Sequence, residues 1–245
     1  MLKCIKVLLL LSATTVSIAD DNPFVNTDVF ELEVAANPQI SPDGSRVAYA
    51  RRSMDVMTDK AVSGIWIVDA NGSNHRPLLS GDQSYNDQVW SPGGDRLAYV
   101  KNVEGRGPQI HVMWVSSGRS GVLTNLRHAP ANIAWSPDGR QMAFTMFVPR
   151  EASSLATPPP QPEGAKWAPP VTVIESVQYR GDGAGYLDAG ETHVFVLSAD
   201  GGTPRQLTSG EYNHGGRIAW TPDSKSLVFS ANRQDDWIFD PMESE

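Results

Sequence analysis

The stretch WSPDGRQMAF, from Trp135 to Phe144, contains the pattern that organises this chain. Three other stretches follow the same rule: ISPDGSRVAY (Ile40–Tyr49), WSPGGDRLAY (Trp90–Tyr99) and WTPDSKSLVF (Trp220–Phe229). In each stretch Ser or Thr precedes a proline, and an aromatic residue stands seven positions after that proline. Repetition at a spacing of tens of residues indicates a repeat architecture.

The centre of each stretch is typical of a tight turn between two strands. Proline presets φ for the first corner, an aspartate such as Asp138 can bond its own backbone, and Gly139 can adopt the positive φ that closes the turn. The small residue beside each aromatic residue, such as Ala143 beside Phe144, favours close packing of one sheet on the next.

A second hairpin pattern follows each of the first three stretches. The strand pairs are Ile65–Val68 with Pro77–Leu79, Val112–Val115 with Val122–Thr124, and Val194–Leu197 with Arg205–Thr208. Turn residues separate the two members of each pair, as in β-hairpins. Two hairpins per repeat make four antiparallel strands, the unit of a β-propeller blade. We therefore predict an all-β fold, an incomplete β-propeller of about 3.5 four-stranded antiparallel blades with WD-like repeats, over residues 37–245.

The spacing of the four prolines locates an insertion. Successive prolines lie 50, 45 and 85 residues apart, so the third unit is longer than the other two. The surplus, about 149–190, contains the proline-dense stretch Thr157–Pro170, which is incompatible with a sheet interior and predicts an exposed excursion. Residues 20–36 precede the first blade as a lead-in, and the capping-box spacing of Asp28 and Glu31 predicts a short helix near Thr27–Ala35.

Residues 1–19 have the features of a signal peptide. Lys3 and Lys6 precede the apolar run Val7–Leu11, and small residues favour cleavage after about Ala19. The sequence therefore predicts a periplasmic or secreted protein with no membrane association after signal removal. Cys4, the single cysteine, would be lost with this segment, which would leave no thiol for disulfides, catalysis or metal binding.

Composition narrows the classes of partner. The net charge of −8 argues against nucleic acid and anionic membranes, which select clustered Lys and Arg. Hydrophobic residues make up 40% of the chain, enough for a sizeable core. The seven tryptophans fall mostly in predicted strands, which favours core positions.

No residue qualifies as a catalytic, cofactor-binding or metal-binding candidate. The five histidines, His75, His111, His128, His193 and His214, lack the spacing of metal ligands. The stretch Asp182–Asp188 lacks the alternating ligands of a calcium loop and favours a glycine-rich turn. Asp235, Asp236 and Asp240 favour a solvated loop, with recognition of a peptide amino terminus as the weaker alternative. Asn71–Ser73 matches a glycosylation sequon, but Asn-Gly is also ordinary hairpin chemistry, and this is the interpretation that we prefer.

A propeller that stops halfway through its fourth blade would leave two blade faces uncovered. Two open blade faces of roughly 400 Å² each would forgo about 20 kcal/mol of apolar burial, which rivals the whole net stability of a domain, about 5–15 kcal/mol. We therefore expect this chain to be a piece of a longer protein, poorly stable or self-associating on its own.

The repeat stretches, together with Val173–Tyr212 and the segment Trp220–Trp237, resemble the N-terminal propeller of the prolyl oligopeptidase family of serine peptidases. The acylaminoacyl peptidase and dipeptidyl aminopeptidase branch is the most similar, and Arg180–Tyr186 carries much of that likeness. The resemblance implies a propeller that gates the access of short peptides to a C-terminal α/β-hydrolase domain, which holds the nucleophile, acid and base.

This chain lacks that catalytic domain. No Gly-x-Ser-x-Gly motif is present, and Gly118–Gly121 has the wrong spacing. We therefore expect the chain to be inactive alone, as the gating part of an exported serine peptidase that acts on peptide substrates. The alternative is a periplasmic Tol-type propeller, a non-catalytic module that binds proteins. A third possibility, a lactonase-like enzyme with its site in a propeller channel, is disfavoured by the absence of a metal-ligand pattern.

Overall fold

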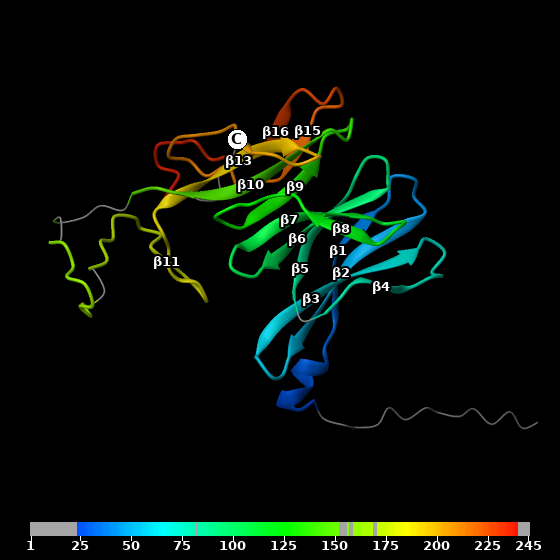
Figure 1. The fold of residues 1–245 in the computed structure, drawn as a ribbon, viewed down its shortest axis with the longest axis horizontal. Coiled ribbons are helices and arrows are strands. Elements are labelled where there is room, and N and C mark those ends of the chain that lie inside the picture. Colours follow the sequence, from blue (N-terminus) through cyan, green and yellow to red (C-terminus); the bar gives the residue numbers. More distant parts are fainter. Residues whose placement is uncertain (1–23, 82, 152–155, 157–158, 169–170, 240–245) are drawn as a thin grey trace, which may run out of the picture.

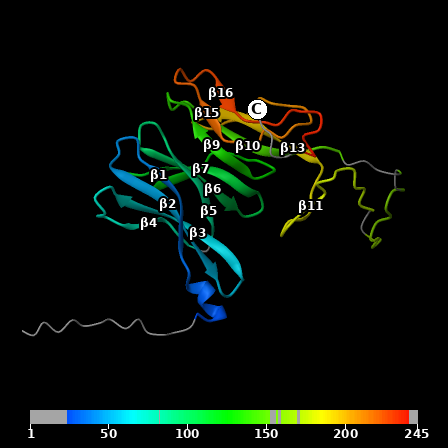
Figure 2. The same ribbon diagram turned by 180° about the vertical axis from the view of Figure 1, so that it is seen from behind.

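The computed structural model describes residues 24–81, 83–151, 156, 159–168 and 171–239. Three four-stranded antiparallel sheets and a two-stranded sheet near the C-terminal end of the described chain follow one another and fan out side by side (Figures 1 and 2). Each four-stranded sheet is one blade, and this last two-stranded sheet is half of a fourth. A second two-stranded sheet lies within the excursion of the third blade. The predicted fold class, an incomplete propeller of about 3.5 blades, is confirmed.

The strands occur in the predicted order. The first blade contains β1 (Val34–Ile40), β2 (Arg46–Asp55), β3 (Lys60–Asp69) and β4 (Arg76–Leu79). The second contains β5 (Tyr85–Trp90), β6 (Arg96–Val103), β7 (Gly107–Trp114) and β8 (Arg119–Val122). The third contains β9 (Pro130–Trp135), β10 (Gln141–Pro149), β13 (Gly190–Ser198) and β14 (Arg205–Gln206), and the half blade contains β15 (Ile218–Trp220) and β16 (Leu227–Phe229).

The repeated turn joins the first two strands of each blade. In the first blade the Gly44 N–H donates to the Ser41 carbonyl at 2.8 Å, and Gly44 has a φ of 72°. The Asp43 carboxylate accepts from the Ser41 hydroxyl at 2.6 Å and from the Ser45 N–H at 3.1 Å, so side-chain hydrogen bonds also stabilise the turn. In the half blade Ser224 occupies the glycine position with a φ of 60°, a conformation that disfavours a side chain.

The two residues that end each repeat face opposite neighbours, because successive side chains of a strand alternate between its faces. Tyr99 packs with Ile65 of the first blade, whereas Ala98 packs with Trp135 of the third. Ala98 is fully buried, as the prediction of close sheet-to-sheet packing requires. The interior is therefore a series of apolar layers between blades.

A ladder of tryptophan hydrogen bonds joins consecutive blades. The indole N–H groups of Trp90, Trp135 and Trp220 donate to the carbonyls of Gln39, Val89 and Ala134 at 3.0, 3.3 and 3.0 Å. Arg46 stacks over Trp90 with 5.1 Å to the ring centroid, and Arg96 stacks over Trp135 with 4.8 Å. Each blade is thus tied to the inner strand of the blade before it.

Not every tryptophan is in the core, so that prediction was partly wrong. Trp90 and Trp135 are buried, but Trp114 and Trp167 are each nearly half exposed. Trp114 is the last residue of β7, and Trp167 belongs to the proline-dense excursion, outside the strands of the blades. A strand pattern predicts the direction of a side chain only relative to its own sheet.

The lead-in also differs from the prediction. It is a 3₁₀ helix, η1 (Asn26–Glu31), and β1 begins at Val34, inside the range expected to be helical. The carboxylate of Asp28 accepts from the Val25 N–H at 2.9 Å, so Asp28 is the third residue of the helical turn rather than its N-cap. Pairing of Val34 with Arg52 of β2 recruits this segment into the sheet. Residues 1–23, which include the predicted signal peptide, are outside the described residues.

The expected excursion leaves the third blade between β10 and β13. The pair Pro149 and Gly190 closes its base. Gly190 has a φ of 147°, and a methyl group there would overlap the Val148 carbonyl oxygen. Within the excursion, the predicted glycine-rich turn is a small hairpin of β11 (Arg180–Gly181) and β12 (Gly185–Tyr186).

Among the described residues, no helix is both long enough and apolar enough to cross a bilayer.

Candidate functional site: a groove along the inner strands

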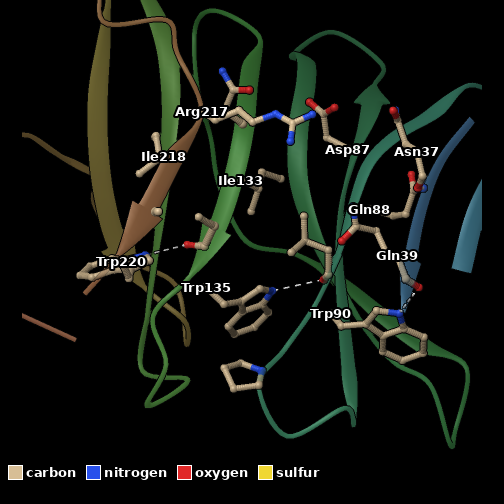
Figure 3. A pocket seen from close by; sticks show the side chains of 15 residues that line it. Asn37, Gln39, Asp87, Gln88, Trp90, Ile133, Trp135, Arg217, Ile218 and Trp220 are labelled. Atoms are coloured by element: carbon tan, nitrogen blue, oxygen red, sulfur yellow. Dashed lines mark hydrogen bonds between the residues drawn. The ribbon is translucent and has the colours of Figure 1, made fainter. Parts of the chain in front are cut away.

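The first strand of each blade faces a shared groove (Figure 3). The strands β1, β5, β9 and β15 contact one another in succession and form its wall. The groove has a volume of about 530 Å³. Its polar lining residues are Asn37, Gln39, Asp87, Gln88, Asn132 and Arg217.

Four of these residues occupy the same position of the repeat. Asn37, Asp87, Asn132 and Arg217 each stand five residues before the proline of the repeated turn. The first three have positive φ angles of 49°, 52° and 53°, and the strand register shifts beside each of them. These are β-bulges, which bend a strand and redirect a side chain. Asn and Asp tolerate this left-handed conformation better than other non-glycine residues.

The groove combines opposite charges. Burial raises the pKa of the Asp87 carboxyl above its ordinary range, and the positive charge of Arg52 partly opposes that effect. Figure 3 shows the Arg217 side chain extending across the groove in the direction of Asp87. One wall of the groove therefore offers an acceptor with negative charge, and the other offers a donor with positive charge.

Two amide side chains in the wall are tied to neighbouring backbone. Gln88 is 1% exposed, and its Nε2 donates to the Asn37 carbonyl at 2.5 Å. Its Oε1 is buried and has no hydrogen-bond partner in the described part of the chain. The Nδ2 of Asn132 donates to Thr145 Oγ1 at 3.1 Å and to the Gly215 carbonyl at 3.0 Å.

The five histidines stay apart from this groove. His193 and His214 are buried, with their rings 5.4 Å apart, and burial lowers the pKa of each. Arg233 Nη2 lies 3.2 Å from His214 Nε2, and His193 Nδ1 lies 3.3 Å from Thr208 Oγ1. His75 lies on the first blade, 2.7 Å from the Tyr49 hydroxyl. No group of three or more His, Cys, Asp or Glu residues with metal-binding geometry is found within the described ranges.

The other sequence features also fall outside the groove. Asp235 and Asp236 are exposed near the end of the described chain, and Asp240 is outside the described residues. Gly118–Gly121 belongs to the β7–β8 hairpin, whereas a nucleophile elbow requires a turn between a strand and a helix. Asn71 lies in the exposed β3–β4 turn, where its Oδ1 accepts from the Ser73 N–H at 2.9 Å. This geometry agrees with the hairpin interpretation.

Our sequence analysis missed the groove residues altogether. The signal was present in the alignment of the repeats, because Asn, Asp and Asn recur at the fifth position before three of the prolines. That recurrence indicates a left-handed backbone position. The convergence of these positions on one groove depends on the arrangement of the blades.

Comparisons with known proteins give the chain its relatives. No family model matches it. It is 30% identical over 205 residues, 84% of its length, to an uncharacterised peptidase of Bacillus subtilis named YuxL. It is 23% identical over 206 residues to dipeptidyl-peptidase 5 of Porphyromonas endodontalis. The match covers 30% of the first of these relatives and 29% of the second, so the chain spans less than a third of their length.

A solved structure has the same fold. An acylaminoacyl peptidase of Pyrococcus horikoshii superimposes with a TM-score of 0.61 over 84% of this chain and 29% of the other, at 18% sequence identity. A shorter similarity, 30% identity over 101 residues, links the chain to the Tol-Pal system protein TolB of Alkalilimnicola ehrlichii, but it covers only 41% of the chain. The repeated blades and the longer peptidase matches together identify this chain as the N-terminal propeller part of the prolyl oligopeptidase family.

Proposed function

We propose that this propeller part gates the access of peptides to a C-terminal α/β-hydrolase domain of the same parent protein. The parent would be an exported serine peptidase, with its nucleophile, acid and base outside residues 1–245. The observation that carries the proposal is the similarity to a named peptidase over 84% of the chain. The absence of a Gly-x-Ser-x-Gly motif supports a role in access rather than in bond cleavage.

The groove supplies a physical basis for selection by size. Its walls are inner strands whose backbones are held by the tryptophan ladder, so its width is set by rigid elements. Its lining offers both acceptors and donors, which suit the main chain of an extended peptide. A wide, folded substrate would have to separate the blades, whereas a short peptide would not.

We also propose that residues 1–19 direct export, with cleavage after about Ala19. Mature residues 20–36 then form the lead-in, and residues 37–245 form the propeller part with its excursion at about 149–190. Protein sequencing of the mature amino terminus tests this export step.

The gating proposal is tested by narrowing the groove in the complete parent protein. The reading frame is followed through codon 245, and the whole product is assayed with a short chromogenic peptide and with a longer peptide that ends in the same residues. Gln39→Trp places a large side chain in the groove wall, and Asn71→Trp at the exposed β3–β4 turn is its matched control. Gating predicts that only Gln39→Trp lowers kcat/KM, and more for the longer peptide. If Gln39→Trp and Asn71→Trp had the same kcat/KM for each peptide, gating through this groove would be refuted.

The second candidate is a Tol-type module that binds proteins without catalysis. The similarity to TolB favours it, although that similarity covers 101 residues and the peptidase match covers 205. A reading frame that ends after further blades without a hydrolase segment would support this alternative.

A further inference from the structure

We propose that the buried histidines His193 and His214 form a pH-sensitive latch that holds the β14–β15 connection, residues 207–217, against the third blade. Mild acidification protonates the pair and releases this connection, while the blades themselves stay folded. The proposal goes beyond the proposed function, because it requires neither a peptide nor a hydrolase domain.

His214 is the centre of the latch. Its side chain is 2% exposed, and its ring centroid lies 5.4 Å from that of His193 and 5.6 Å from that of Phe229 in β16. The backbone N–H of His214 donates to the Thr192 carbonyl of β13 at 2.8 Å. His214 therefore joins the connection to the third blade and to the half blade at one point.

The two neighbours of His214 are bonded to the third blade as well. Asn213 Oδ1 accepts from the Thr192 N–H at 2.9 Å, and the Gly215 carbonyl accepts from Asn132 Nδ2 at 3.0 Å. Three consecutive residues of the connection are thus tied to β9 and β13, and His214 is the titratable one among them. A change in the charge of this ring acts where the connection is most strongly attached.

Arg233 determines the protonation state of His214. Its Nη2 lies 3.2 Å from His214 Nε2. A guanidinium group can only donate, so Nε2 is the acceptor and the ring is neutral, with its proton on Nδ1. A proton on Nε2 would set two donors and two positive charges against each other. Burial lowers the pKa of His214, and the positive charges of Arg233 and His193 lower it further, whereas the carbonyls of Thr192 and Tyr212 oppose this effect.

The charged side chains around the pair do not favour its protonation. Burial lowers the pKa of His193, and the negative charge of Glu191 opposes that effect. Arg150, directly after β10, lies 3.6 Å from Glu191 and 3.8 Å from Glu211 of the connection, so it compensates part of both charges. Within the described residues, a protonated pair would therefore meet Arg233 and little negative charge that is not already paired.

Proton linkage gives the size of the effect. In the open latch both rings meet water, where the pKa of a histidine is about 6.5. Because the closed latch disfavours the protonated rings, its stability is complete above pH ~6.5 and is lost as the pH falls below that value. Between about pH 7.5 and about pH 5.5 the open population should rise about tenfold if one ring titrates on opening, and about a hundredfold if both do.

Hydrogen exchange followed by mass spectrometry on the full chain tests the proposal at these two pH values, with rates corrected for the intrinsic effect of pH. We expect the exchange of residues 207–217 to accelerate about ten- to a hundredfold on acidification. The corresponding β8–β9 connection, residues 123–129, has no buried pair of histidines and should keep its protection.

Variants separate the latch from a general loss of stability. Gln at position 214 can still accept from Arg233 but does not titrate, so the double variant His193→Gln/His214→Gln should stay closed at both pH values. If a thermal melt at the higher pH shows this variant unfolded, His193→Gln alone should reduce the acceleration to about tenfold. His75→Gln, on the first blade, is the matched control and should keep the full response.

Three results would overturn the proposal. They are exchange of residues 207–217 that does not respond to pH, an equal acceleration in all three blades, and an unchanged response in whichever folded variant lacks His193. None of these measurements involves peptide cleavage or the width of the groove. Failure of the latch would therefore leave the gating proposal standing, and failure of gating would leave the latch.

Discussion

Replacement of Trp135 by Phe measures how strongly the tryptophan ladder holds two blades together. Trp135 is 7% exposed, its indole N–H donates to the Val89 carbonyl at 3.3 Å, and Arg96 stacks on its ring. Loss of the hydrogen bond costs about 0.5–1.5 kcal/mol. Weakening of the cation–π contact costs about 0.5–1 kcal/mol more. We therefore expect Trp135→Phe to lower the free energy of unfolding by about 2 kcal/mol, from these two losses together.

Two matched substitutions make the prediction specific. Trp220 makes the same indole hydrogen bond, at 3.0 Å to Ala134, but Gln141 occupies the position that Arg96 holds in the preceding blade. Trp220→Phe should therefore cost about 1 kcal/mol, the hydrogen bond alone. Trp114 is 46% exposed at the end of β7, and Trp114→Phe should cost less than about 0.5 kcal/mol.

Urea unfolding followed by far-ultraviolet circular dichroism provides the measurement, because that signal does not depend on tryptophan fluorescence. The slope with denaturant should be the same in all three variants, so that midpoints compare stabilities. The reasoning would be refuted if Trp114→Phe destabilised the protein as much as Trp135→Phe. An Arg96→Met variant closes a double-mutant cycle, and a coupling energy of zero would remove the cation–π part of the argument.

Three further predictions concern one backbone position and two kinds of titrating group. Gly190→Ala should cost about 3 kcal/mol or more by thermal melting, because a methyl group would overlap the backbone of β10, whereas Gly121→Ala, with open space around it, should cost less than about 1 kcal/mol. Hydrogen bonds lower the pKa of Asp43 to about 2, so its contribution to stability is complete above pH ~4 and should be lost as the pH falls toward 2. Asp43→Asn should make the melting temperature less dependent on pH in this range. An unchanged pH dependence of the melting temperature in Asp43→Asn would contradict this prediction. Burial lowers the pKa values of His193 and His214, so the folded state favours neutral rings. The melting temperature should therefore decrease as the pH is lowered from ~6.5, and it should decrease less in His193→Gln. A melting temperature that rises on acidification would contradict this prediction.

The repeated hairpins could be predicted because their signals are local. Proline, Asp43 and Gly44 specify the turn within four residues, and the alternation of small and aromatic residues specifies the two faces of the strand. The same local reasoning placed the excursion between β10 and β13. It failed at Val34, where pairing with β2 outweighed a helical pattern, and at Trp114, where exposure depends on which sheet lies opposite.

The candidate site could not be predicted in the same way. Asp87 and Arg217 are separated by 130 positions in the sequence, and each is an ordinary polar residue in its own strand. The three bulge positions and Arg217 become neighbours only when the inner strands stack side by side, an arrangement that the tryptophan hydrogen bonds hold together. The position of the Gln88 side chain is likewise a property of packing, since its amide nitrogen donates to the Asn37 carbonyl of another blade.

The residue pattern alone therefore specifies the blades, because the dihedral preferences of proline, aspartate and glycine act over a few residues. The same repeat stretches carry the resemblance to the family. Which side chains share the groove, and what charge and hydrogen-bonding capacity they present there, depends on how the blades pack. Burial and convergence arise from contacts between blades that are far apart in the chain, and no local pattern contains that information.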